Sequence, residues 1–514
     1  MSELDTQTTM VSLFCLGLSI LIFERTRGGL NKSPLPPGPP QHGIAGNIKD
    51  IPSTKEWESY TAMGKKYGPI VYLRVLTRRI VVVNTMHVAA DLFDKRSNIY
   101  SDRPRFPMLN ELMGWWWNTG LMPYGSYWRE HRRVLHHYFN QDAVKRYYEL
   151  QTRTNLAFLR SLMESPTDFW HHIRWSAGAN ILNLSYGIEV APKNDPWIVL
   201  ADESIESIAK GGLPGSYFVD WLPVFKHLPE WFPGAGFKKR AREWHQLSTR
   251  MLHAPLEWVK DQMSQGNAPP SMAAELLEHG LEGRKVPMDV IRNVSAVIYL
   301  GGADTTVSII DAFFLCITLH RDKQRAAQEE LDRVVGYGRM PVFSDRESLP
   351  YVNAVMLEVM RMFPVTPLGI PRRVMEDDEY AGMRIPKGAT VLANIWGMLR
   401  DEAEYDNPHV FVPERFVKDG AVNTSIRDPR TVFFGFGKRI CAGRHFADSS
   451  VWLVVATVLA CFNIRPAKDE HGNDIIPSTE MRSGLLSCPL QFECEIVPRS
   501  EDARRLILST SDQI

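Results

Sequence analysis

The chain has 514 residues, 44% of them hydrophobic and 23% charged, which is enough for two or three domains or for one large domain with a full core. Lys plus Arg equals Asp plus Glu at 59 each, so no basic excess is available to neutralise nucleic-acid phosphates. The six cysteines are scattered without a C-x-x-C pair, which argues against a disulfide scaffold or a structural zinc site and favours reducing surroundings.

The first apolar segment, "TMVSLFCLGLSILIF", predicts a membrane anchor helix at 9–24 behind a luminal tail at 1–8. Acidic residues precede it, while Arg25, Arg27 and Lys32 follow it, a charge pattern that places the body of the protein in the cytosol. A cleaved signal peptide is the alternative, although its first region should be basic. We therefore expect a single-pass protein of the endoplasmic reticulum membrane. About 20 residues cross a bilayer comfortably, so the segment is short for a full span.

A basic and proline-rich hinge at 25–45 contains "SPLPPGPP", which cannot be helical and predicts a stiff extended spacer. Beyond it, residues 46–514 are expected to form one catalytic domain. Alternating Val and Ile at 68–86 predict a hairpin of two strands. Helical patterns dominate from 120 to 335, and short strand patterns return at 373–394 and near the C-terminus, so the fold class is mainly α with minor β.

Two loops interrupt the helical region, "GGLPGSYFVDWLP" and "LPEWFPGAG", and both are rich in Trp, Phe and Pro. Local packing explains such a composition, and so does a face that dips into the bilayer beside the anchor. The sequence leaves both interpretations open.

The stretch "FFGFGKRICAGRHFA" places Cys441 behind a glycine-rich bend and before an apolar helical run. Nearby cations and the N-terminus of a helix stabilise a thiolate. Gly437 and Gly443 allow close approach of the backbone, so that main-chain N–H groups can point at the sulfur. A soft, deprotonated sulfur in this setting is a metal ligand, and haem iron is one of its few natural partners.

With Phe434, Gly437, Arg439, Cys441 and Gly443 in this order, the loop resembles the haem-binding loop of the cytochrome P450 superfamily, the haem-thiolate monooxygenases. The resemblance implies the large helical domain with small sheets of that family, and haem b whose iron is ligated axially by Cys441. It covers roughly residues 35–500. Stretches such as "NELMGW" and "WFPGA" are most similar to microsomal fungal members of secondary metabolism.

A long apolar helix is predicted from Met288 to His320, and "GGADTT" lies in its middle. Adjacent glycines in a helix cost roughly 1 kcal/mol each, and a Thr hydroxyl can bond back to a helix carbonyl and bend the helix. We therefore expect an opened helix in which a carboxylate and an alcohol form a groove for dioxygen and a proton path. A plain buried helix and a second membrane span are the alternatives. By the resemblance, Asp304 and Thr305 are the acid–alcohol pair of oxygen activation.

Glu358 and Arg361 are three residues apart in the apolar stretch "NAVMLEVMRMFP". A buried Glu and Arg must be paired and further hydrogen-bonded, or they destabilise the fold. Arg415 in "PERF" offers a third partner. The three residues resemble the structural Glu–Arg–Arg brace of the family.

In "YWREHRRVLHHYF", Trp128 and Arg132 are four residues apart and share a helix face. A solvated basic face is one interpretation. The resemblance implies instead that both reach a haem propionate, together with Arg439 and with Arg372, where many relatives have histidine. Other cations on that side are expected to dock an acidic electron donor: Arg129, Arg133 and Lys438.

The resemblance implies a monooxygenase that inserts one atom of O2 into a lipophilic substrate, with electrons from NADPH. Because this chain shows no flavin or nucleotide fingerprint, NADPH–cytochrome P450 reductase is the expected donor, with cytochrome b5 as a second one. Two other classes remain open: a haem-thiolate isomerase, dehydratase or peroxygenase, and a non-enzymatic membrane-tethered haem- or lipid-binding protein.

By the resemblance, four segments line the substrate pocket: 106–117, Val297–Gly302, Val365–Ile370 and Ser483–Leu486. They are apolar and aromatic, which favours a small lipophilic substrate such as a terpenoid, a polycyclic aromatic or an indole. The three consecutive tryptophans in the first segment fit a pocket wall and loop packing equally well.

Overall fold

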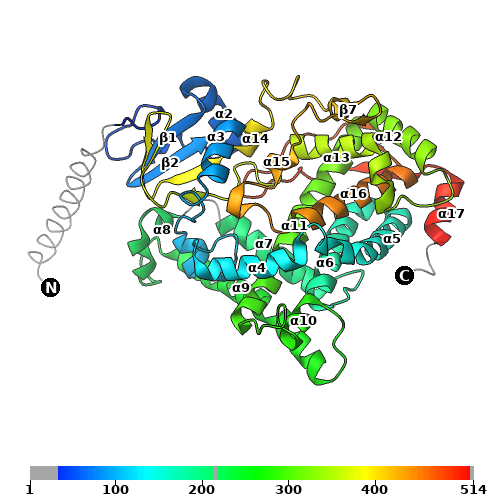
Figure 1. Ribbon diagram of the computed structural model, residues 1–514, viewed down its shortest axis with the longest axis horizontal. Helices are drawn as coiled ribbons and strands as arrows, with labels where there is room; N and C mark the ends of the chain where they lie inside the picture. Colours follow the sequence, from blue (N-terminus) through cyan, green and yellow to red (C-terminus); the bar gives the residue numbers. More distant parts are fainter. Residues whose placement is uncertain (1–32, 212–216, 510–514) are drawn as a thin grey trace, which may run out of the picture.

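The computed structural model describes residues 33–211 and 217–509. The expected luminal tail (1–8), the anchor (9–24) and the first part of the hinge lie outside the described residues. Figure 1 shows a mainly helical body with the sheet of β1 and β2 at one end and β7 far from it, beside α12 and α13. The expected class, mainly α with minor β, is confirmed.

The helices of the described ranges run as follows: α2 (Glu56–Tyr67), α3 (Met86–Ala89), α4 (Ser126–Phe139), α5 (Tyr148–Glu164), α6 (Phe169–Tyr186), α7 (Pro196–Gly211), α8 (Phe218–Trp221), α9 (Gly236–Ser264), α10 (Met272–Glu278), α11 (Met288–Leu319), α12 (Arg321–Val334), α13 (Pro350–Met362), α14 (Ile395–Met398), α15 (Arg430–Phe433), α16 (Arg444–Cys461) and α17 (Glu501–Ser509). The strands are β1 (Ile70–Val75), β2 (Arg78–Val83), β3 (Arg372–Arg373), β4 (Asp378–Tyr380), β5 (Met383–Ile385), β6 (Thr390–Ala393), β7 (Val417–Lys418), β8 (Ala421–Val422), β9 (Phe462–Lys468), β10 (Asp474–Ile475) and β11 (Cys494–Pro498).

The hairpin expected at 68–86 is confirmed as β1 and β2, which pair antiparallel from Ile70 opposite Val83 to Val75 opposite Arg78. Their β-branched residues suit a pleated, largely buried surface. The sheet continues in the order β1-β2-β6-β3, with β6 parallel to β2. Through β3 it carries Arg372 to the edge of the candidate site.

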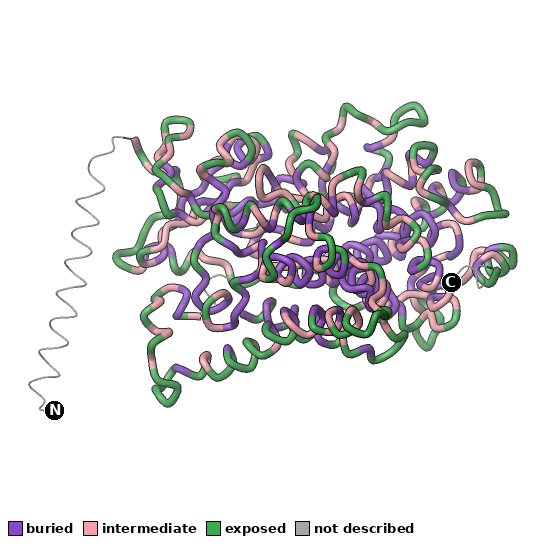
Figure 2. The backbone as a smooth tube through the Cα atoms, turned by 60° about the horizontal axis from the view of Figure 1, so that its bottom comes forward, coloured by how far each residue is buried: buried purple, intermediate pink, exposed green. Residues whose placement is uncertain are grey.

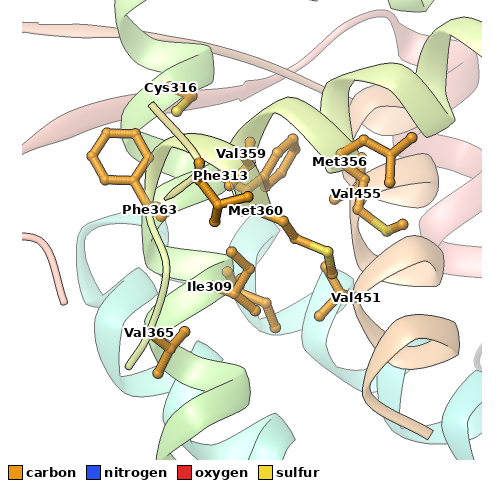
Figure 3. Packing of buried hydrophobic residues seen from close by; sticks show 14 of the residues in the cluster. Ile309, Phe313, Cys316, Met356, Val359, Met360, Phe363, Val365, Val451 and Val455 are labelled. Carbon is orange, nitrogen blue, oxygen red and sulfur yellow. The ribbon is translucent and has the colours of Figure 1, made fainter. Parts of the chain in front are cut away.

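Helix α11 forms the central element of the fold, and α6, α13 and α16 pack against it. Figure 3 shows Ile309 and Phe313 of α11 among Met356 and Met360 of α13, with Val451 of α16 beside them. Within the described ranges, α11 is the helix long and apolar enough to cross a membrane, and 72% of its most apolar window is buried inside the protein. It is therefore a core helix, in agreement with the purple, buried course of the central helices in Figure 2.

A buried ion pair lies within α13, and its further contacts tie this helix to the segment between α14 and α15. Arg361 donates from Nε and Nη2 to the two Glu358 oxygens at 2.8 Å each, and neither side chain is exposed. Arg415 approaches Glu358 at 3.2 Å, and Arg361 also donates to the Leu399 and Pro408 carbonyls. The three residues expected to form a brace are thus brought together, with the further hydrogen bonds that a buried pair needs.

Candidate active site

The loop that carries Cys441 runs from α15 to α16 through a tight turn at Gly437–Arg439. The Cys441 N–H donates to the Phe434 carbonyl at 2.8 Å, and α16 begins three residues later. Gly437 has φ of 53°, and a Cβ at this position would lie 2.0 Å from the Phe93 carbonyl oxygen, so only glycine fits. Gly443 differs from expectation, because it has an ordinary φ of −85° and nothing lies within 4 Å of a Cβ built there.

The Cys441 side chain lines an internal cavity, and its exposure is to that cavity. Burial raises the pKa of the Cys441 thiol, while the Gly443 N–H and the charges of Arg132 and Arg444 oppose this effect. The expected helix N-terminus and cations are therefore present, but burial outweighs them. Burial thus favours the thiol form of Cys441, whereas a cation bound to the sulfur would favour the thiolate.

The cavity beside Cys441 has about 1630 Å³ of atom-free space, counting its opening to solvent. Three of the four expected segments contribute to its wall: 297–302, 365–370 and 483–486. The sequence did not reveal the contributions of Asn118 and Leu121, or of Ile205 and Ile208 on α7. The one sequence signal for Ile205 and Ile208 is the apolar face of α7, which predicts that these residues point inward.

The segment 106–117 does not line the cavity, which corrects one expectation. Trp115 and Trp117 are fully buried in a core cluster, and Trp117 Nε1 donates to Ser248 Oγ of α9 at 3.0 Å. Trp116 between them is 49% exposed. Of the two interpretations of the three tryptophans, loop packing is correct, and the pocket wall begins one residue later at Asn118.

Three arginines line the cavity: Arg103, Arg372 and Arg439. Burial and mutual repulsion lower the pKa of Arg372 to about 9 and that of Arg103 well below its usual range, and burial lowers the pKa of Arg439 to about 10. Arg372 Nη2 donates to the Phe436 carbonyl at 2.7 Å, but Arg372 Nη1 is buried without a partner. No Asp or Glu belongs to the cavity wall in the described ranges. An anionic group in the cavity would pair with these cations.

Trp128 and Arg132 do not belong to that wall, and their expected contacts with a haem propionate stay predictions. Trp128 is buried, and its Nε1 donates to the Thr119 carbonyl at 3.2 Å. The guanidinium carbon of Arg439 lies over the Trp128 ring, 4.3 Å from the ring centroid. Trp128 therefore supports Arg439, whose nitrogens bond to the carbonyls of Ser101, Thr119 and Met122. Arg132 acts on Cys441 through its charge. Arg103 was missed, since "SDRPRF" carries no signal beyond a basic residue.

Thr305 lines the cavity, and its hydroxyl donates back to the Gly301 carbonyl at 2.7 Å. Helix α11 nevertheless continues unbroken from Met288 to Leu319, so the opened helix is not found. Asp304 is turned away from the cavity and lies 3.4 Å from Arg174, which bonds to Asp202 at 2.6 Å. The acid and the alcohol are neighbours in sequence but face different sides of the helix, because successive helix residues are about 100° apart.

Burial raises the pKa of Asp304, against the effect of Arg174. The exposed fraction of the side chain falls from 41% at Asp202 and 34% at Arg174 to 16% at Asp304. The three charges thus form a path from solvent to the middle of α11. A proton can be held at Asp304, on a side of the helix that does not face the cavity.

Comparison with known proteins places these features in context. The family model "Cytochrome P450" matches residues 36–494. Cytochrome P450 monooxygenase COX2 of Coprinopsis cinerea is 38% identical over 99% of this chain and 97% of its own length. Cytochrome P450 monooxygenase 208 of Postia placenta is 40% identical over 95% of each chain. Tryptamine 4-monooxygenase of Psilocybe cyanescens is 38% identical over 96% of this chain and 98% of its own length.

Proposed function

We propose a function on one premise: the chain belongs to the cytochrome P450 family and is a monooxygenase. Its substrate is a small lipophilic molecule of fungal secondary metabolism, a terpenoid, an aromatic or an indole, into which one atom of O2 is inserted. The observation that carries the proposal is a lone cysteine facing a large apolar cavity whose rim holds three buried guanidinium groups.

Haem b fits this cavity by its chemistry. Cys441 would supply the thiolate ligand of the iron, and Gly437 and Phe434 hold the loop that presents it. The free Arg372 Nη1, with Arg103 and Arg439, matches the two carboxylates of a haem, because guanidinium groups bind carboxylates in a fork. When bound, the haem supplies the activation of dioxygen, which the thiolate promotes by donating electron density.

The protein's own part in the reaction is to exclude water, orient the substrate and hold protons. Val297, Leu300 and Ile370 give the cavity an apolar wall that removes the substrate from water. The Thr305 hydroxyl lies on the cavity side. Asp304 takes up a proton from solvent when its contact with Arg174, already long at 3.4 Å, opens, and Arg174 and Asp202 line the way from solvent to this carboxyl.

Few polar side chains interrupt the apolar wall, and Asn118 is one of them. Its Oδ1 accepts a hydrogen bond from the Gly120 N–H at 2.8 Å, which leaves its amide nitrogen for a substrate oxygen. The name of the Psilocybe relative supports an indole, while the apolar composition of the wall supports a terpenoid as well.

Electrons are proposed to come from NADPH–cytochrome P450 reductase, with cytochrome b5 as a second donor. Arg133 is exposed, Arg129 lies against the Tyr124 ring, and Lys438 donates to the Tyr124 hydroxyl. This basic group on α4 and the Cys441 loop suits an acidic protein surface.

The proposed location is the endoplasmic reticulum membrane, with the catalytic domain in the cytosol. Large apolar side chains are exposed around α8 and the following loop, with Phe218 at 77%, Val224 at 66% and Trp231 at 81%. Such a patch favours contact with the apolar edge of a bilayer. Figure 1 places α8 beside the β1–β2 end of the molecule, where the described chain begins.

Incubation with a fungal reductase, NADPH and ¹⁸O2 tests the function. Extracts and defined panels of terpenoids, aromatics and indoles should give a product that carries one ¹⁸O atom. A product that carries ¹⁸O only from labelled water, or formation without NADPH, would contradict it.

For the membrane patch, Phe218→Asp with Trp231→Asp should reduce vesicle flotation of a chain that begins at residue 33. The control Tyr337→Asp, 64% exposed beyond α12, should not. If the double variant floats as well as the Tyr337→Asp control, the patch around α8 does not contact the membrane.

A further inference from the structure

A second cavity lies behind α11, on the side away from Cys441. The centre of a water molecule can occupy about 10 Å³ of it. Four helices supply its wall: Gln151 and Asn155 on α5, Ser176 and Asn180 on α6, Thr306 on α11 and Ser450 on α16. These helices pack together in the middle of the protein, as Figure 1 shows. A polar cavity of this size has room for water.

Three amide side chains of this wall each have a carbonyl oxygen without a partner: Gln151 Oε1, Asn155 Oδ1 and Asn180 Oδ1. The residues are only 1%, 3% and 8% exposed. The amide nitrogen of Gln151 already bonds to Ser450 Oγ at 2.8 Å, and that of Asn155 to Thr457 Oγ1 at 2.9 Å. The Gln151 nitrogen also donates to the Phe446 carbonyl at 3.3 Å, and the Thr457 hydroxyl donates its own proton to the Leu453 carbonyl, so exchanging nitrogen and oxygen of either amide would break one of these bonds. Buried acceptors of this kind are rarely left unpaired in a folded protein.

Thr306 is the one residue that lines both cavities in the described ranges. The preceding Thr305 hydroxyl is bonded to the Gly301 carbonyl, whereas the Thr306 hydroxyl has no partner among the described residues. It can therefore turn toward either cavity.

We propose that the second cavity binds one ordered water, and that this water and the amide oxygens around it give the Thr306 hydroxyl a role at the active site as a second hydrogen-bonding group beside Thr305. The water donates to two of the three amide oxygens, because one water molecule offers two protons. The Thr306 O–H donates to the water or to the third amide oxygen when it points into the second cavity. When it turns to the main cavity, it donates a hydrogen bond to a molecule bound there, and no proton leaves the side chain.

The water itself is tested without turnover, by a high-resolution crystal structure of the haem-loaded enzyme. We expect density within hydrogen-bonding distance of at least two of the three amide oxygens and of Thr306 Oγ1. Asn180→Leu, which replaces one acceptor by a methyl group, should remove or displace that density. A dry cavity in the wild-type enzyme would overturn the proposal.

The role of Thr306 rests on the proposed function and is tested by coupling, the ratio of peroxide released to NADPH consumed. Thr306→Val should raise this ratio about fivefold, which corresponds to ~1 kcal/mol, the net value of one hydrogen bond. Thr306→Ser should return it toward the wild-type ratio. The control is Thr318→Val on the same helix, whose buried hydroxyl donates to the Phe314 carbonyl and contacts the Cys494 thiol, and which lines neither cavity.

Wild-type coupling in Thr306→Val, with product still formed, overturns the role of Thr306 and leaves the proposed function intact. Absence of product in the wild-type enzyme overturns the proposed function itself. The crystallographic water stands or falls independently of both results.

Discussion

Replacement of Arg372 by Met should weaken the hold of the protein on haem. Arg372 uses Nη2 on the Phe436 carbonyl and leaves Nη1 buried and unpaired at the cavity. One charge-assisted hydrogen bond from Nη1 to a propionate is worth ~1.5–3 kcal/mol, so haem should leave Arg372→Met roughly 10- to 150-fold faster. Transfer of haem to an excess of apomyoglobin, followed by absorbance well below the unfolding temperature, measures this rate.

The neighbouring residue provides a matched control. Arg373 lies next to Arg372 on β3, but successive strand residues point to opposite faces, and Arg373 pairs with Asp102 outside the cavity. Arg373→Met should lower the unfolding temperature, because Asp102 is buried, and should leave the haem transfer rate unchanged. Equal transfer rates in wild type, Arg372→Met and Arg373→Met would refute the assignment of Arg372.

Three further predictions concern the fold and the proton path. Glu358→Gln should lower the free energy of unfolding by ~3 kcal/mol in denaturant titration, because Arg361 would remain buried without its counter-charge. The control is Glu501→Gln, which removes an exposed ion pair with Arg504 and should change the free energy of unfolding by less than ~0.5 kcal/mol. Asp304→Asn should lower the rate of product formation by ~10-fold or more, since it removes the proton carrier on α11. Glu203→Gln, on the exposed face of α7, should leave that rate unchanged. Equal rates of product formation in the two variants would contradict the proton path through Asp304. Burial raises the pKa of Asp220 to about 6 in the folded state, above its ordinary 3.8, so this carboxyl destabilises the fold increasingly as pH rises through that interval. Asp220→Asn, which can still accept the Met108 N–H, should therefore stabilise by ~1 kcal/mol more at pH 7.5 than at pH 5, and a pH-independent difference would contradict this.

The local features of the sequence predicted much of the site. Cys441, the glycine at 437 and the Glu358–Arg361–Arg415 contacts depend on short-range spacing or on the strict needs of buried charge, and all have the expected geometry. The hairpin at 70–83 follows from the alternation of its β-branched residues.

What depends on side-chain direction was not predictable. Asp304 and Thr305 are adjacent in sequence, yet Asp304 pairs with Arg174 on one side of α11 and the Thr305 hydroxyl lies on another. Trp115 and Trp117 carry the composition of a pocket wall, but α9 covers them. Arg103 reaches the cavity only because the fold brings the loop before α4 beside β3. Such contacts join distant parts of the chain, and no local pattern encodes them.

The central claim is that Cys441 ligates haem iron. Its most direct test is the reduced, carbon monoxide-bound difference spectrum of membranes prepared from cells that express this chain. The account predicts a strongly red-shifted Soret band for the wild type and for Cys488→Ser, since Cys488 lies outside the cavity wall. The band should be lost in Cys441→Ser. The same band in Cys441→Ser, or none in folded, haem-loaded wild type, would contradict ligation of haem iron by Cys441 and the function derived from it.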